Sequence, residues 1–210
     1  CYPRSIVLFF YINIAPMKVT NPATEEVIAN LTEDTVATLQ QKHEQLKAGQ
    51  AKWNAVPLSE RVAILQKFAA LLKENIESLA AILTSEVGKP LQQSRNEVNG
   101  ACARIEWLTN NAEKFLSDET VSEQPGMKEV ISYEPLGVVC NISAWNYPYL
   151  VGTNVFVPAL LAGNAVMYKP SEYSSLTGEQ IVKLLHLAGV HADAVQLAIG
   201  GGEVGKTLLE

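Results

Sequence analysis

The chain has 210 residues, 48% of them hydrophobic and 18% charged, and this composition excludes intrinsic disorder as its main state. Sixteen basic and 22 acidic residues give a net charge of −6, which argues against a surface for nucleic acid or an anionic membrane. The three cysteines, Cys1, Cys102 and Cys140, are too few and too scattered for a disulfide framework or a zinc site. We therefore expect a cytoplasmic protein without a bound metal.

The two ends of the chain differ from its interior. Residue 1 is Cys, and residues 5–15 form an apolar run that is shorter than the about 20 residues needed to cross a bilayer. A secretory signal is the less favoured alternative, because no clean cleavage site follows this run. Met17 opens a more polar segment, so we expect residues 1–16 to be an upstream or non-native leader. The last residues, GEVGKTLLE, are typical of a helix that has just begun, and we expect the natural protein to continue.

Residues 17–118 are predicted to be mainly helical, because apolar residues recur there at helical spacing. The first stripe consists of Val36, Leu39, His43, Leu46 and Trp53. The second consists of Val62, Leu65, Phe68, Ala69, Leu72, Ile76 and Leu79, and it ends before Gly88 and Pro90. The third lies within a long helix over residues 91–116 and consists of Val98, Ala101, Ile105, Leu108 and Ala112. We expect all three stripes to face the core.

The pattern changes after residue 117. Pro125 and Gly126 mark a turn, and residues 128–134 alternate as a strand does, so residues 119–135 are predicted to form a strand pair. Short apolar runs at 137–142, 165–169 and 195–199 are typical of buried parallel strands. Helical segments at 149–162 and 174–188 separate them. Residues 136–210 therefore predict an α/β fold, the first βαβαβ part of a Rossmann-type parallel sheet.

Ligands of open parallel sheets bind beyond the carboxyl ends of the strands, where this sequence places three polar turns. In the first turn, Asn146 offers an amide donor that could stabilise a developing oxyanion, or it could merely satisfy the turn. In the second, Lys169 and Glu172 could hold a phosphate or ribose, or they could be exposed turn residues. The third, Gly200-x-Gly202-x-x-Gly205, matches a dinucleotide-binding pattern weakly, because it follows the third strand rather than the first.

The order of these turns resembles the aldehyde dehydrogenase superfamily. Residues 133–172 are similar to the family segments P-x-G-V-V-x-x-I-x-P-W-N-F-P and A-L-x-x-G-N-x-V-x-x-K-P-S-E. NPATEEVI at 21–28 and EVGKP at 86–90 resemble N-terminal segments of the same family, so the resemblance covers residues 18–210. The chain departs from the pattern at Ala144, where the family usually has Pro, and at Tyr147, where it usually has Phe.

The resemblance implies that the chain is the N-terminal portion of an NAD(P)-dependent enzyme that oxidises an aldehyde to a carboxylic acid. Asn146 would bind the oxyanion of the thiohemiacetal. The cofactor-binding residues would be Ile142, Ser143, Ala144, Trp145, Lys169, Ser171, Glu172, Gly202 and Gly205. A carboxylate at Glu172 would repel a 2′-phosphate, which favours NAD over NADP. The strand pair at 119–135 would build a homodimer or homotetramer.

In this family a cysteine attacks the aldehyde and a glutamate activates the water that releases the acid. We expect both to lie beyond this chain, because Cys102 and Cys140 read as buried, inert thiols. His43, His186 and His191 lack the spacing of a catalytic triad, and the last two read as surface or capping residues. Two alternatives stay open: a non-catalytic dinucleotide-binding or subunit-interaction module, and the reductive acyl-phosphate or acyl-CoA branch of the superfamily.

Overall fold

The structure is a computed structural model that describes residues 16–210, so the predicted leader lies almost wholly outside the described residues. A short antiparallel hairpin, β1 (Met17–Thr20) and β2 (Val27–Leu31), precedes the first helix. This hairpin was not predicted: β1 alternates but has only four residues, and β2 shows no clear alternation. No helix in residues 16–210 is long and apolar enough to cross a membrane.

Four helices follow: α1 (Val36–Asn54), α2 (Leu58–Glu74), α3 (Ile76–Val87) and α4 (Leu91–Leu116). The predicted bounds of α4 are confirmed, but the second stripe divides into two helices at Asn75, whose N–H donates to the Leu71 and Leu72 carbonyls. Val36 and His43 were wrongly assigned to the core, because both are exposed. They lie one turn before and one turn after the buried Leu39, at the edge of the stripe.

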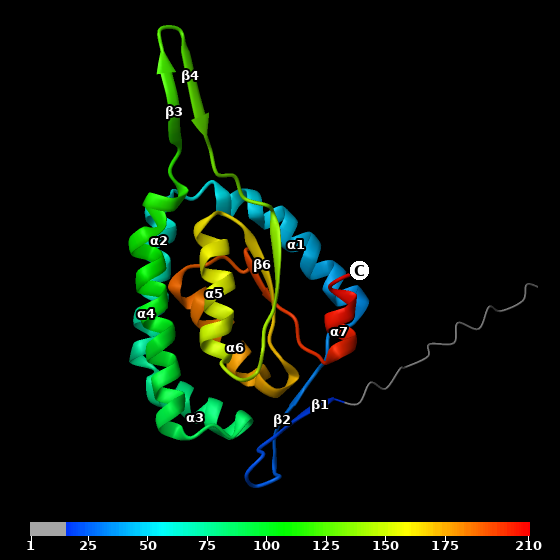
Figure 1. Cartoon of the computed structure of the whole chain (residues 1–210). Helices are drawn as coiled ribbons and strands as arrows, with labels where there is room; N and C mark the ends of the chain where they lie inside the picture. Colours follow the sequence, from blue (N-terminus) through cyan, green and yellow to red (C-terminus); the bar gives the residue numbers. More distant parts are fainter. Residues whose placement is uncertain (1–15) are drawn as a thin grey trace, which may run out of the picture.

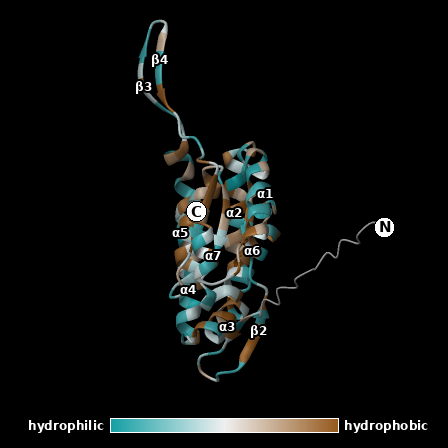
Figure 2. Cartoon of the chain, turned by 90° about the vertical axis from the view of Figure 1, so that its right-hand side faces the viewer, coloured by the Kyte–Doolittle hydropathy of each residue, from teal (hydrophilic) through white to brown (hydrophobic). Residues whose placement is uncertain are grey.

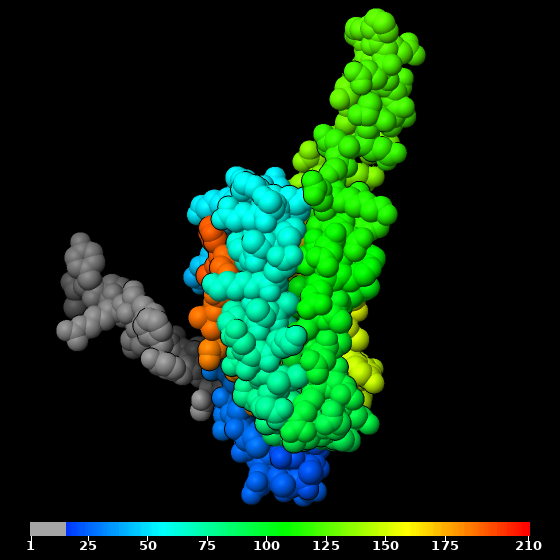
Figure 3. Space-filling model, turned by 90° about the vertical axis from the view of Figure 1, so that its left-hand side faces the viewer, coloured from blue at the N-terminus to red at the C-terminus, as the bar shows by residue number. Residues whose placement is uncertain are grey.

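A second hairpin, β3 (Glu119–Gln124) and β4 (Met127–Ile131), projects away from the body of the molecule (Figure 1). Gly126 adopts a positive φ of 86° in its turn, as the Pro-Gly signal predicts. The space-filling view shows the hairpin beyond the end of α4, with no other element beside it (Figure 3). Among residues 16–210 its strands pair only with each other, and an isolated two-stranded hairpin is marginally stable in water.

The α/β half contains the predicted parallel sheet in the order β5 (Val138–Ile142), β6 (Ala165–Lys169) and β7 (Val195–Leu197). The connections are α5 (Pro148–Leu161), the single turn η1 (Glu172–Ser174) and α6 (Ser175–Ala188), and α7 (Gly202–Thr207) follows β7. The β7 strand ends two residues earlier than the sequence predicts. β5 was expected to be buried, but as the edge strand it is mostly half-buried or exposed.

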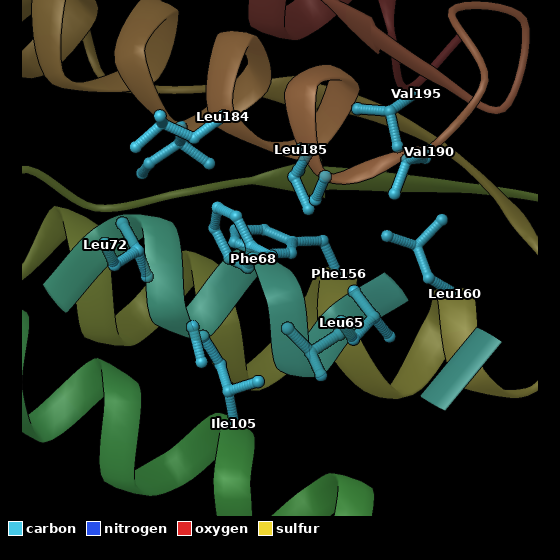
Figure 4. Close-up of a cluster of buried hydrophobic side chains, with 14 of the residues drawn as sticks. Leu65, Phe68, Leu72, Ile105, Phe156, Leu160, Leu184, Leu185, Val190 and Val195 are labelled. Atoms are coloured by element: carbon cyan, nitrogen blue, oxygen red, sulfur yellow. The ribbon is translucent and has the colours of Figure 1, made fainter. Parts of the chain in front are cut away.

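Side chains of the central strand point alternately to two apolar clusters. Val166 and Tyr168 face α5 and α6, on whose outer side α2, α3 and α4 pack. Ala165 and Met167 face α1 and α7 on the other side of the sheet. Figure 4 shows the larger cluster, in which Phe68 of α2 meets Phe156 of α5, while Figure 2 shows polar residues over much of the outer helical surface. The sheet is thus held between helical layers, and its carboxyl ends stay open.

Candidate functional site

The carboxyl ends of β5 and β6 lie side by side and form one edge of a groove. Ile142 and Lys169 are register partners, and the N–H of Ser143 donates to the carbonyl of Lys169 at 2.9 Å. The groove has a volume of about 460 Å³. The predicted cofactor-binding residues that line it are Ile142, Ser143, Ala144, Lys169, Ser171, Glu172, Gly202 and Gly205. The fold therefore gathers residues from all three predicted turns.

Trp145 is the one predicted cofactor-binding residue that does not line this groove. Its side chain is half exposed and lies in a neighbouring hollow of about 580 Å³ beside β1. Glu172 borders both hollows, so they adjoin at that carboxylate. The two spaces together offer a longer binding surface than either does alone.

Lys169 gives the groove a cation. The residue is only 3% exposed, and its ammonium donates to the Pro170 carbonyl at 3.1 Å. Burial lowers the pKa of Lys169, while Glu172 opposes that shift. A Cβ added at Gly205 would lie 3.6 Å from the Lys169 side chain, so glycine leaves room beside it. An ammonium and a carboxylate therefore border one groove, and each suits a different polar group of a ligand.

The two serines of the groove differ in what their hydroxyls do. Ser171 accepts from the Tyr173 N–H and contacts a Glu172 oxygen, both at 3.3 Å, so it begins η1 and orients that carboxylate. The buried Ser143 hydroxyl lies beside the buried Tyr168 hydroxyl, and it opposes the rise that burial causes in the pKa of Tyr168. Ser143 therefore lines the groove while its hydroxyl faces the buried Tyr168.

Asn146 lies in the exposed loop between β5 and α5, and within residues 16–210 its side-chain amide has no hydrogen-bond partner. Its backbone carbonyl, in contrast, accepts from the Lys89 ammonium at 2.6 Å. Lys89 also pairs with the buried Glu97, whose carboxylate accepts from the Tyr149 N–H at 2.8 Å. Sequence reasoning missed both residues; the EVGKP segment was a signal for Lys89 alone.

Glu86 occupies the corresponding place at the start of α6. Its carboxylate accepts from the N–H groups of Leu176 at 2.9 Å and Thr177 at 2.7 Å, and also from the Thr177 hydroxyl. Burial raises the pKa of Glu86 to about 7, and these hydrogen bonds oppose the shift without cancelling it. Two glutamates of the outer helices therefore fix the starts of the two helices that follow the candidate site.

Neither described cysteine is placed or tuned as a nucleophile beside Asn146. Cys102 is buried on α4, and desolvation raises the pKa of its thiol to about 11. The prediction that Cys140 is buried is wrong, because β5 is the edge strand, although desolvation still raises the pKa of this thiol. Cys140 points into a different hollow, with Leu39 and Met167 on the α1 side of the sheet.

All three histidines are exposed, as predicted for His186 and His191. A ring nitrogen of His186 lies 3.1 Å from the Val195 carbonyl, and the His191 ring lies edge-on to Trp53. Within residues 16–210, no group of three or more His, Cys, Asp or Glu side chains is arranged to hold a metal ion.

Comparison with known proteins places this geometry in a family. Residues 13–210 match the model of the Aldehyde dehydrogenase family. The chain belongs to this family. It is 34% identical over 193 residues to glutarate-semialdehyde dehydrogenase of Pseudomonas putida and 31% identical over 188 residues to succinate semialdehyde dehydrogenase of Acinetobacter baylyi. These alignments cover 91% and 90% of the chain but 40% and 39% of the two aldehyde dehydrogenases. The chain therefore spans about two fifths of their length.

Solved aldehyde dehydrogenases share the fold. The enzyme of Brucella melitensis biovar abortus matches with a TM-score of 0.87 at 33% identity, over 92% of this chain and 40% of that one. Indole-3-acetaldehyde dehydrogenase of P. syringae, in complex with NAD+ and IAA, matches with a TM-score of 0.88 at 30% identity and the same coverage. An NADP dependent enzyme of E. coli matches with a TM-score of 0.87 at 27% identity, again with this coverage. The predicted fold class is thus confirmed, and both dinucleotides occur among similar proteins.

Proposed function

We propose that the whole protein is an NAD-dependent aldehyde dehydrogenase that oxidises an aldehyde to a carboxylic acid through a cysteine thioester. In the first step, a thiolate adds to the carbonyl carbon of the aldehyde, and the carbonyl oxygen becomes an oxyanion. Loss of hydride from that carbon leaves a thioester. Water, deprotonated by a glutamate, then releases the acid and regenerates the thiol.

The observation that carries this proposal is the free side-chain amide of Asn146 at the carboxyl end of β5. Its N–H groups have no protein acceptor within residues 16–210, while its backbone is fixed through Lys89. A donor held in place before the reaction stabilises a developing oxyanion without further reorganisation. We therefore assign Asn146 as the oxyanion donor, as the sequence resemblance implies.

The groove at Lys169 and Glu172 fits a nicotinamide dinucleotide. Glu172 would accept from ribose hydroxyls, and Lys169 would donate to hydroxyl or phosphate oxygens. Gly202 and Gly205 allow close approach of a ligand to the backbone at α7. When bound, the dinucleotide supplies the hydride acceptor. The carboxylate of Glu172 disfavours a 2′-phosphate and supports NAD over NADP.

The nucleophile and the general base come, in this proposal, from parts of the protein outside the 210 residues. The raised thiol pKa values of Cys102 and Cys140 support this placement, because a thiol that stays protonated is a poor nucleophile. The length of the relatives supports it as well, since the chain matches about two fifths of them.

The test is Asn146→Ala in the whole protein, with an aldehyde and NAD as substrates. We expect kcat to fall by about 10²–10³-fold, the usual effect of removing one oxyanion donor. Asn110→Ala, an exposed asparagine on α4, is the matched control and should leave kcat unchanged. An unchanged kcat in Asn146→Ala would refute the assigned role. NAD binding without any aldehyde oxidation in the wild-type protein would favour the non-catalytic module instead.

We propose further that the β3–β4 hairpin contributes to a homo-oligomer. Val121, Met127, Val130 and Ile131 are exposed on it, and Figure 2 shows the apolar segment at the base of β4. A strand of another subunit would cover these side chains and pair with a free strand edge. Val130→Lys should lower the mass of the assembly in sedimentation experiments, whereas the hairpin variant Glu129→Gln should not. Equal assembly masses for the two variants would show that the hairpin does not take part in the interface.

A further inference from the structure

The Lys89 ammonium contacts three groups at one point beside the candidate oxyanion loop. It pairs with the Glu97 carboxylate, donates to the Asn146 carbonyl at 2.6 Å and lies 3.9 Å from the centre of the Tyr147 ring. The Lys89 side chain is 9% exposed and that of Glu97 is fully buried. A cation is attracted to a carbonyl oxygen, to a carboxylate and to the face of an aromatic ring, so all three contacts are favourable.

The backbone holds Lys89 in this place. Gly88 ends α3 in the left-handed conformation with φ of 76°, and Pro90 precedes the first residue of α4. A residue before proline is restricted to extended backbone conformations, so Lys89 leaves the α3–α4 corner in a fixed direction. The ammonium therefore starts from a rigid corner, whereas the loop that it contacts has no regular secondary structure.

Glu97 connects the same ammonium to the helix that follows the loop. One oxygen of its carboxylate contacts Lys89, and the other accepts from the Tyr149 N–H in the first turn of α5. The loop is thus anchored at two points: Lys89 holds the Asn146 carbonyl, and Glu97 holds the Tyr149 N–H three residues later. Desolvation raises the pKa of Glu97, and Lys89 opposes that shift, so the cation favours the ionised carboxylate.

We propose that Lys89 and Glu97 are positioning residues that fix the Asn146 amide in the orientation needed to bind the oxyanion. Neither side chain is assigned a contact with the aldehyde or the dinucleotide; both act through the Asn146 loop. The proposal rests on the oxyanion role proposed above for Asn146. It predicts that loosening the pair lowers kcat and leaves dinucleotide binding unchanged.

The variant Lys89→Met/Glu97→Gln tests this without leaving a buried charge unpaired, a change that often destabilises a protein strongly. The introduced glutamine side chain would be uncharged, and its amide oxygen can still accept from the Tyr149 N–H. We expect kcat to fall by about 10- to 100-fold, since small misplacements of a catalytic group have effects of that order. KM for NAD should stay the same. Lys89→Arg, which keeps a charged donor, should restore part of kcat relative to Lys89→Met.

A double-mutant cycle with Asn146→Ala separates a positioning role from an independent one. If Lys89 and Glu97 act through Asn146, their substitution should cause no further loss of kcat once the amide is gone. The proposal would be overturned if adding Lys89→Met/Glu97→Gln to Asn146→Ala lowered kcat by the full factor again. It would also be overturned if Lys89→Met/Glu97→Gln alone left kcat unchanged while Asn146→Ala alone lowered it. An unimpaired Asn146→Ala would instead refute the oxyanion role itself, so the two failures are distinguishable.

Hydrogen exchange supplies a readout that does not depend on activity. In the wild-type protein, the Val151 N–H donates to the Tyr147 carbonyl at 2.8 Å in the first turn of α5. We expect Lys89→Met/Glu97→Gln to accelerate exchange in the peptide that spans residues 143–151. Arg95→Gln, which removes the more exposed ion pair with Glu77 between α3 and α4, is the matched control and should not change that peptide. Unchanged exchange in both variants would overturn the proposal.

Discussion

The α5 and α6 helices begin in similar ways but in different electrostatic settings. Each follows a strand of the parallel sheet and a candidate site loop, and each has N–H groups of its first turn bound by a buried glutamate from the outer helices. Glu97 at the start of α5 is paired with Lys89, whereas Glu86 at the start of α6 forms no salt bridge within residues 16–210. Both helices thus begin at a buried glutamate, but only the charge of Glu97 is neutralised by a lysine.

This difference means that the two glutamates beside the candidate site respond differently to pH. Desolvation raises the pKa of the paired glutamate, and Lys89 opposes that shift, so the cation favours the ionised carboxylate that anchors the Asn146 loop. The unpaired glutamate has a pKa raised to about 7, so its charge at the start of α6 changes near neutral pH. The proposed oxyanion side of the site is therefore held by an ion pair, and the proposed cofactor side borders an unpaired carboxyl group that titrates near neutral pH.

The largest expected effect on stability comes from breaking the Lys89–Glu97 ion pair. Glu97→Ala leaves Lys89 without its buried partner and the Tyr149 N–H without its acceptor, so we expect the free energy of unfolding to fall by about 3–5 kcal/mol. Denaturant titration of the whole protein measures this change. Glu77→Ala removes the partner of Arg95 in a more exposed ion pair and should cost far less, because solvent screens that pair. Equal costs would show that burial does not distinguish the two pairs.

The second prediction concerns Glu86 and pH. A carboxyl group whose pKa is raised on folding contributes stability below its unfolded pKa, and this contribution is lost as pH rises through the folded value of about 7. The stability of the wild type relative to Glu86→Gln should therefore fall by about 3 kcal/mol between about pH 4 and pH 8. Urea denaturation of both proteins across this range measures the difference.

Glu77→Gln is the control for the pH experiment. The hydrogen bond with Arg95 lowers the pKa of Glu77, so its contribution to stability is present above its unfolded pKa and lost in acid, the opposite sign. Parallel stability curves for the wild type and Glu86→Gln would contradict the titration of Glu86 near neutral pH.

The sequence predicted the regular elements well wherever apolar spacing was strong. The 26-residue α4 has a clear apolar stripe, and its bounds follow from Pro90 and from the polar segment after Leu116. The burial of β5 was not predictable from its own residues, because an apolar strand reads the same at the centre and at the edge of a sheet. Cys140 is exposed for that reason.

The candidate site was predictable to the extent that its residues follow the strands. Lys169, Ser171 and Glu172 come directly after β6, and the carboxyl ends of parallel strands share one edge, so their proximity follows from topology. The roles of Glu86 and Glu97 depend on hydrogen bonds that span about 90 and about 50 residues of chain. No local spacing reports such contacts: Glu86 stands out only as part of the EVGKP segment, and Glu97 reads as a polar position on an ordinary helix.

The smallest expected effect lies at the cofactor side. Hydrogen bonds to a charged group contribute about 1.5–3 kcal/mol, so Glu172→Gln should lower kcat/KM for NAD by about 10- to 100-fold and reduce the preference for NAD over NADP. At saturating NAD, kcat should change little, because the Asn146 loop stays anchored by Lys89. Steady-state kinetics with both dinucleotides measures this, with Glu129→Gln on the distant hairpin as the control. If Glu172→Gln lowered kcat as much as Lys89→Met/Glu97→Gln does, the cofactor side and the oxyanion side of the site would not act separately.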